Sequence, residues 1–247
     1  MRIWICCLLL GSIVLQAPLP AQTPLPPANA EPDQEAEIQV EGLAKPQDAT
    51  LDQFREAQQA FEKYRESLAP SAPLLFELLP SNKQGITTES LDTVKLALVG
   101  EEDRIPITIG ANHRFTMPDL APLKGKYKLF ANVGKKPIIV VPHIYSPGTS
   151  KEDRRLGDLL LECQTFWGFY KSEVPFILRP AFAMVGGCRS KKISIMTRMA
   201  GPIASVRVSD KGKTKDIALN PKFPLSYRQP LYDKSLSNEA RVTITYK

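Results

Sequence analysis

Histidine and cysteine, which often supply nucleophilic or metal-binding groups, are scarce in this sequence. Among 247 residues there are 2 histidines and 4 cysteines. Cys6 and Cys7 lie within an apolar run at the N-terminus, too early to be a lipoprotein acceptor. No H-E-x-x-H, C-x-x-C or G-x-S-x-G motif is present, so the sequence favours neither a transition-metal site nor a hydrolase nucleophile. We therefore expect no catalytic residue, no metal and no cofactor.

The two histidines leave one catalytic alternative open. His113 falls in a predicted loop and His143 in a predicted strand, and a Ser-His-Asp set can be drawn with either one. Under this alternative the protein is a secreted hydrolase that uses His113 or His143.

Long apolar runs are also missing, and a membrane helix needs roughly 20 such residues. The run at residues 3–15 follows Arg2 and precedes small residues, which is the layout of a secretory signal peptide. The candidate cleavage positions follow Ala21, which fits best, Ala17 and Ala30. We expect residues 1–21 to be removed and the protein to reach the periplasm or the medium without a transmembrane span.

Only Cys163 and Cys188 remain outside the N-terminal run. In an oxidising compartment a lone pair most simply forms one disulfide. The bond contributes on the order of 3 kcal/mol if it acts through chain entropy. Two buried thiols, or one catalytic cysteine, are the alternatives.

Charge is unevenly distributed along the chain. Residues 31–41 hold five acids and no base, residues 42–178 balance 17 bases with 17 acids, and residues 179–247 hold 14 bases and 4 acids. A basic region of this size is usually a solvated face, but it can attract anionic polymers such as glycans, or surface lipids. Nucleic acid is not an expected partner of an exported protein whose bases lack clustered aromatic residues.

A linker and a helix are predicted before the first β-region. Residues 22–49 are rich in proline, alanine and acids, which predicts a disordered linker. Residues 50–69 predict an amphipathic helix that begins with a Thr50–Gln53 capping box and ends at Pro70. Its apolar stripe consists of Leu51, Phe54, Ala57, Phe61, Tyr64 and Leu68.

From Leu74 onward the apolar period changes from helical spacing to two. Short alternating runs are bounded by Gly, Pro, Asn and Asp, a pattern typical of antiparallel sheets. We assign residues 72–163 to a first β-sandwich unit, with the run "RRLGDLLLEC" at residues 154–163 as its closing strand.

The alternation returns near the C-terminus and predicts a second, basic β-unit at residues 189–247. The first set is Leu96, Leu98, Ile107, Ile109, Phe115, Met117, Tyr127, Leu129 and Ala131. The matching set is Val206, Val208, Ile217, Leu219, Phe223, Leu225, Val242, Ile244 and Tyr246. Such a match favours two copies of one unit, although chance alternation in a β-protein can imitate it.

Between the two predicted units, residues 164–188 form an aromatic-rich segment bracketed by the two cysteines. Pro175 and Pro180 exclude one long helix, so we expect short helices that end at Gly186 and Gly187. The segment is either a hydrophobic plug between the units or the lining of a ligand groove, and the plug is favoured because cores are commoner.

The run "GANHRFTMPDLAPLKGKYKLFANV" resembles the end of a carboxypeptidase-regulatory-like or transthyretin-like β-sandwich repeat. The resemblance covers about residues 74–133 and is carried by Gly110, Phe115, Leu120, Gly125, Tyr127 and Leu129. It implies a sandwich of about seven strands with a stabilising, linking or binding role. The whole chain also resembles a family of exported bacterial proteins, which implies export but no activity.

Two groups of polar residues are candidate contact sites. Loops on rigid β-scaffolds often carry recognition, and the candidate binding loop holds Tyr227, Arg228, Tyr232 and Asp233. The second group is either a surface ion-pair cluster or a contact patch for a partner, and it consists of Asp153, Arg154, Arg155 and Asp158.

The expected fold is mainly β with minor α: two Ig-like or transthyretin-like antiparallel sandwich units, one N-terminal amphipathic helix and a helical segment between the units. The expected function is an exported, non-enzymatic binding or accessory protein of the bacterial cell envelope that recognises a protein or glycan. The alternatives are attachment of the basic C-terminal unit to an anionic envelope polymer, and the hydrolase described above.

Overall fold

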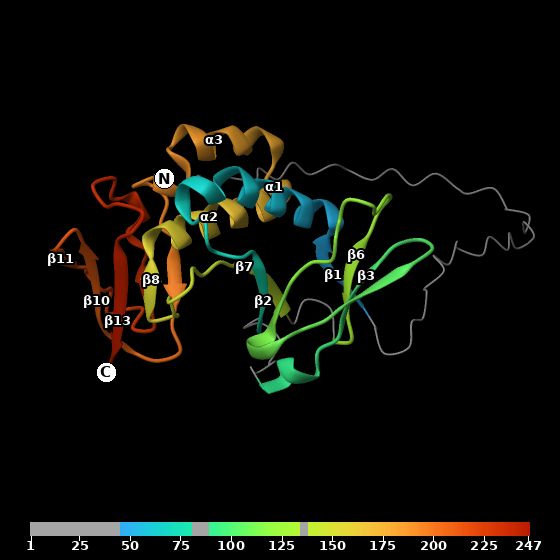
Figure 1. The fold of residues 1–247 in the computed structure, drawn as a ribbon, viewed down its shortest axis with the longest axis horizontal. Helices are drawn as coiled ribbons and strands as arrows, with labels where there is room; N and C mark the ends of the chain where they lie inside the picture. Colours follow the sequence, from blue (N-terminus) through green and yellow to red (C-terminus); the bar gives the residue numbers. More distant parts are fainter. Residues whose placement is uncertain (1–44, 81–88, 134–137) are drawn as a thin grey trace, which may run out of the picture. The chain divides into compact units, whose positions relative to one another are not determined.

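The computed structural model describes residues 45–80, 89–133 and 138–247, all of which lie in one compact unit, Gln39–Lys247. Within these ranges there are 13 strands in antiparallel sheets and three α-helices, with about 31% of residues helical and 30% in strands (Figure 1). No helix in the described part is long and apolar enough to cross a membrane. The predicted signal peptide and residues 22–44 of the predicted linker lie outside the described residues.

The first sheet has the strand order β1-β6-β3-β4. Its members are β1 (Lys45–Thr50), β6 (Lys128–Ala131), β3 (Leu96–Val99) and β4 (Arg104–Ile107). A smaller sheet has the order β5-β2-β7 and consists of β5 (Arg114–Phe115), β2 (Leu75–Pro80) and β7 (Ile138–His143). The two sheets and helix α1 (Leu51–Leu68) share one apolar core. Phe54 lies at its centre, with ring centroids 5.1 Å from Phe76 and 5.0 Å from Phe169.

The second sheet has the order β8-β13-β10-β11. Its members are β8 (Asp153–Arg155), β13 (Arg241–Tyr246), β10 (Ile203–Asp210) and β11 (Lys213–Asp216). Beside it, β9 (Met196–Arg198) pairs with β12 (Ser226–Arg228). Helix α2 (Leu156–Tyr170) supplies Leu156, Leu159 and Leu160 to the core of this half.

The two four-stranded sheets have the same connections as well as the same order. Each begins with a strand that leads directly into a helix, and each contains a hairpin whose first strand also pairs with the last strand. In each half, the first residue of the helix donates its backbone N–H to the residue just before the last strand. Leu51 donates to the Tyr127 carbonyl at 3.1 Å, and Leu156 donates to the Ala240 carbonyl at 2.8 Å.

The register corrects part of the predicted alignment. Leu98 faces Leu129, and Val208 faces Val242, so Leu129 occupies the place of Val242 and the predicted match of Tyr127 with Val242 is wrong by two residues. The predicted match of Phe115 with Phe223 is also wrong. Phe115 pairs with Phe76 on β2 and Tyr227 pairs with Thr197 on β9, whereas Phe223 lies in an exposed turn. Alternation of apolar residues alone does not fix the register of a strand.

Helix α1 agrees closely with the prediction. The Thr50 side chain accepts from the Gln53 N–H, and the Gln53 side chain accepts from the Thr50 N–H at 2.8 Å, which completes the capping box. The residues just before the helix differ from the prediction. Residues 45–50 form strand β1, which pairs with β6, whereas residues up to 49 were predicted to be a disordered linker.

The predicted closing strand at residues 154–163 is wrong. Only Asp153–Arg155 is a strand, and Leu156–Tyr170 is helix α2. The helix is buried on more than one side, since Leu160 and Leu161 contribute to different apolar clusters. A short apolar run that is buried all round shows no helical period, and periodicity then cannot separate strand from helix.

The segment between the halves contains short helices, as predicted. After α2 come the 3₁₀ turns Lys171–Glu173 and Phe176–Leu178, helix α3 (Arg179–Met184) and the turn Gly187–Arg189. Gly186 and Gly187 have φ of 100° and 57°, a left-handed conformation that glycine adopts easily. The Cys163–Cys188 disulfide is confirmed, with a Cα–Cα distance of 6.0 Å.

Candidate functional site

The candidate binding loop divides into a buried and an accessible part. Tyr227 is buried on β12, and burial raises the pKa of its hydroxyl to about 12, so it belongs to the core. The Arg228 guanidinium lies 4.5 Å from the centroid of the Tyr232 ring and donates to the Lys191 carbonyl at 2.7 Å. Tyr232 and Asp233, the remaining members, border a cleft.

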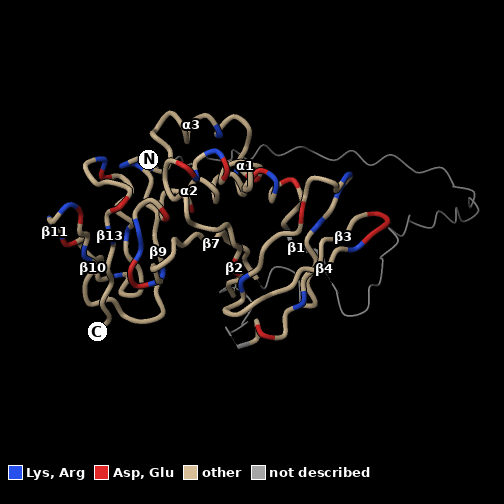
Figure 2. The backbone as a smooth tube through the Cα atoms, viewed as in Figure 1, with Lys and Arg blue, Asp and Glu red and all other residues tan. Residues whose placement is uncertain are grey.

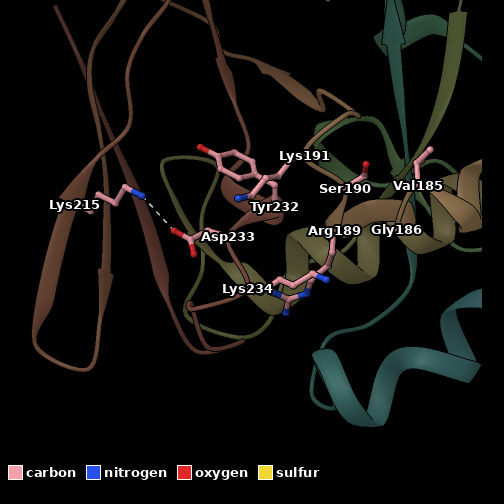
Figure 3. Close-up of a pocket in the computed structure, with 9 residues that line it drawn as sticks. All are labelled: Val185, Gly186, Arg189, Ser190, Lys191, Lys215, Tyr232, Asp233 and Lys234. Atoms are coloured by element: carbon pink, nitrogen blue, oxygen red, sulfur yellow. Dashed lines mark hydrogen bonds and ion pairs between the residues drawn. The ribbon is translucent and has the colours of Figure 1, made fainter.

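This basic cleft, shown in Figure 3, has a volume of about 530 Å³. It lies between the turn after α3 and the loop that follows β12. Its lining residues are Val185, Gly186, Arg189, Ser190, Lys191, Lys215, Tyr232, Asp233 and Lys234. Tyr232 and Asp233 were predicted from the sequence, whereas the cations were not singled out; their only signal was the basic excess of residues 179–247, which includes the run "CRSKK" at residues 188–192.

Positive charge dominates the cleft. Its one carboxylate, Asp233, is paired with Lys215 at 3.2 Å, and hydrogen bonds from Ser235 hold the pKa of Asp233 below its usual value. Lys191 and Lys234 are exposed and have no carboxylate partner in the part of the chain that the structure describes. Four cations against one carboxylate leave an excess of three positive charges, which suits an anionic group.

Two of the cations, Arg189 and Lys191, lie on a turn whose backbone is anchored by several contacts. Cys188 anchors the turn to α2 through the disulfide, and the adjacent Arg189 donates to the Asn238 side chain at 3.1 Å. Ser190 is buried, and its hydroxyl accepts from the Lys192 N–H at 3.1 Å. The backbone that carries Arg189 and Lys191 is therefore set before any ligand arrives, which lowers the backbone entropy lost on binding.

The second predicted group is not a surface patch, because Arg154 and Asp158 are buried. Arg154 donates to the Ile144 carbonyl at 3.0 Å and to Glu162 at 2.9 Å. Asp158 accepts from the Ser146 N–H at 2.8 Å and from its hydroxyl at 2.6 Å. These groups cross-link α2 to the chain before β8.

The other two members of that group, Asp153 and Arg155, lie nearer the surface and also have partners. Arg155 donates to Glu239 at 2.7 Å, and Asp153 is paired with Arg241. The first contact connects β8 to the loop before β13, and the second connects β8 to β13 itself. The four residues thus stabilise the second half of the fold, and none of them is left unpaired for a contact patch.

His143 is buried at the end of β7. Its Nδ1 donates to Glu77 at 2.9 Å, its ring stacks on Tyr145 at 3.9 Å, and the Arg154 guanidinium lies 3.7 Å from the Tyr145 centroid. Nε2 of His143 is buried and has no hydrogen-bond partner among the described residues. His143 lines neither the basic cleft nor the cleft on the first sheet that includes His113.

His113 lies in a second cleft, of about 400 Å³, on the first sheet. Its Nε2 is 2.8 Å from Oδ1 of Asp92. Asn112 and His113 both have positive φ, at 58° and 59°. None of the residues that line this cleft is a serine, threonine or cysteine. Elsewhere in the described ranges, no cluster of three or more His, Cys, Asp or Glu side chains could hold a metal ion.

Comparison with protein-family models, curated proteins and solved structures finds no match for this chain.

Proposed function

We propose that this chain is an exported, non-enzymatic binding or accessory protein of the bacterial cell envelope. Its basic cleft holds an anionic group of a glycan or protein partner. The observation that carries the proposal is the set of cations Arg189, Lys191, Lys215 and Lys234 around a cleft with a single carboxylate. This unites the expected recognition role with the expected affinity of the basic C-terminal unit for anionic polymers.

The side chains that line the basic cleft suit recognition of an anionic partner. Ammonium groups attract phosphate, sulfate or carboxylate without demanding one geometry, and the Tyr232 ring adds a flat surface for a sugar or an apolar group. Since Lys191 and Lys234 are exposed, salt should screen their attraction strongly.

We further propose that the fold arose by duplication of one β-sandwich unit. The identical strand order of the two large sheets supports it, as does a core in the first half that includes side chains from both its sheets. The resemblance of residues 74–133 to carboxypeptidase-regulatory-like repeats is part of the same proposal. Phe115, Tyr127 and Leu129 are buried there, and Gly125 has φ of 96°.

Binding of a defined polyanion tests the proposed function. We expect the protein to bind dextran sulfate in isothermal titration calorimetry, with affinity that falls steeply as salt rises. The double variant Lys191→Gln/Lys234→Gln should bind several-fold more weakly. Lys126→Gln/Lys128→Gln is the matched control, because it removes the same charge from exposed positions at the first sheet. Equal loss in both variants, or binding that is insensitive to salt, would contradict a cleft-specific site.

A second candidate function, a hydrolase that uses His113, is favoured by one observation, the His113–Asp92 pair in a cleft. A His–Asp pair can activate a water molecule as a general base. Hydrolysis of p-nitrophenyl acetate by the protein and by His113→Ala and His143→Ala variants tests it. A rate that neither substitution lowers would exclude this candidate.

A further inference from the structure

One short segment holds half of the large apolar side chains that are exposed in the described chain. Five of these ten residues belong to the apolar segment, residues 176–185. The exposed fractions are 80% for Phe176, 85% for Ile177 and 85% for Met184, and Leu178 and Val185 are exposed as well. Helix α3, which covers part of the segment, contains no buried residue. The predicted hydrophobic plug is therefore wrong for this stretch.

The apolar segment is nevertheless well anchored. Phe182 stacks on Trp167 of α2 with ring centroids 4.0 Å apart. The disulfide fixes the chain just after the segment, and the Arg179 side chain donates to the Val174 carbonyl at 2.9 Å. One aromatic ring of α3 thus faces the protein while its neighbours project outward. The three most exposed side chains, Phe176, Ile177 and Met184, line neither of the two clefts, so a flat and deformable partner suits them better than a protein side chain that fills a pocket.

Cations lie before, within and after the apolar segment along the chain. Residues 171–192 hold five cations, Lys171, Arg179, Arg189, Lys191 and Lys192, and one acid, Glu173. Lys171 is paired with Glu56 at 3.6 Å, so the other four cations carry the excess positive charge. The carboxylate of Glu173 already accepts from Gln53 at 2.9 Å. Val185 belongs both to the segment and to the lining of the basic cleft, so the two surfaces are continuous. In Figure 2 the tube around α3 is almost entirely tan, and blue stretches follow it along the C-terminal part.

We infer that the apolar segment and the adjoining cations form a docking surface for an anionic phospholipid membrane. The apolar side chains enter the boundary between headgroups and acyl chains, and the cations contact the phosphates. A second copy of this chain would place like charges against each other, whereas an anionic bilayer neutralises them. The lipid contact of the basic cleft rests on the affinity for anionic groups in the proposed function, although the partner is a phospholipid rather than a glycan or protein; the role of the apolar segment does not rest on it.

Vesicle flotation tests the inference with the protein as it is isolated from cells. We expect binding to vesicles of phosphatidylglycerol mixed with phosphatidylcholine and much weaker binding to phosphatidylcholine alone. Phe176→Ser/Ile177→Ser should weaken binding about a hundredfold, because burial of each such side chain contributes about a factor of ten. The control Phe223→Ser/Ile139→Ser removes the same two residue types from sites with exposed fractions of 57% and 42% and should bind as the wild type does. Any contribution from residues 1–44 is common to all variants.

The outcomes separate the inference from the proposed function. Absence of vesicle binding, with dextran sulfate binding retained, overturns the membrane inference alone. Equal binding by Phe176→Ser/Ile177→Ser and the wild type also overturns it. A dimer in light scattering that the same variant converts to monomer would show that a second copy covers the segment. Unchanged near-ultraviolet circular dichroism in each variant shows that folding is not the cause of a loss.

Discussion

At the scale of single residues, burial decides what the charged groups of this protein do. Arg154 and Arg155 are neighbours in the sequence, but successive side chains of a strand point to opposite faces. On β8, Arg154 therefore enters the core and pairs with Glu162, while Arg155 reaches Glu239 near the surface. A surface ion-pair cluster was one of the two interpretations of the sequence, and the sequence did not reveal which of these residues is inside.

The partly buried Glu77–His143 pair leads to a prediction about acid stability. Burial raises the pKa of the Glu77 carboxyl, but the hydrogen bond and charge of His143, together with the charges of Lys151 and Arg114, bring it below its ordinary value of 4.5. The pair therefore stabilises the fold above that value, and the stabilisation is lost as the pH falls through the lower folded-state pKa. We expect Glu77→Gln to lose about 1–3 kcal/mol at neutral pH and to show a flatter acid dependence.

Urea unfolding at about pH 7 and about pH 3.5 measures this difference. Glu102→Gln is the control, because Glu102 is exposed and its removal should change neither value. An acid dependence in Glu77→Gln as steep as that of the wild type would show that other carboxylates are responsible.

At the scale of elements, the crossing of α1 and α2 joins the two halves. Figure 1 shows the two helices side by side between the large sheets. A Cβ added at Gly168 of α2 would lie 2.7 Å from the Glu56 carbonyl oxygen and 2.8 Å from the Ala60 Cβ of α1. The capping box of α1 is local and was predicted, whereas this close approach involves residues over a hundred positions apart and was not.

We expect Gly168→Ala to destabilise the protein, although alanine favours helix by about 1 kcal/mol. The added methyl group meets backbone, which cannot rotate away, so the helices must separate at a cost of about 1–3 kcal/mol. Thermal melting followed by circular dichroism measures the change. A Gly168→Ala protein that melts at or above the wild-type temperature would mean that the helices part easily.

At the scale of the whole molecule, the two halves are not independent. Phe169 of α2 belongs to the core of the first half, and Leu68 of α1 packs on the core of the second. The Leu68 carbonyl also accepts from Arg155 at 2.6 Å. Each half therefore lacks part of its interior when the other is absent.

This sharing predicts one cooperative unfolding transition for the described part of the chain. In differential scanning calorimetry the ratio of calorimetric to van't Hoff enthalpy should be close to one, as for a two-state protein. Two resolved transitions, each with about half of the enthalpy, would instead show that the halves unfold separately.

The sequence by itself determined helix α1, the antiparallel character of the sheets, the short helices after α2 and the Cys163–Cys188 bond. Each depends on local periodicity, on capping or on the fact that only two cysteines remain. The nature of α2, the burial of Tyr227 and Asp158, and the gathering of Lys191, Lys215 and Lys234 around one cleft were decided only by tertiary structure. These features depend on which distant segments meet. The sequence of an alternating or fully apolar run does not show which segment it will pack against.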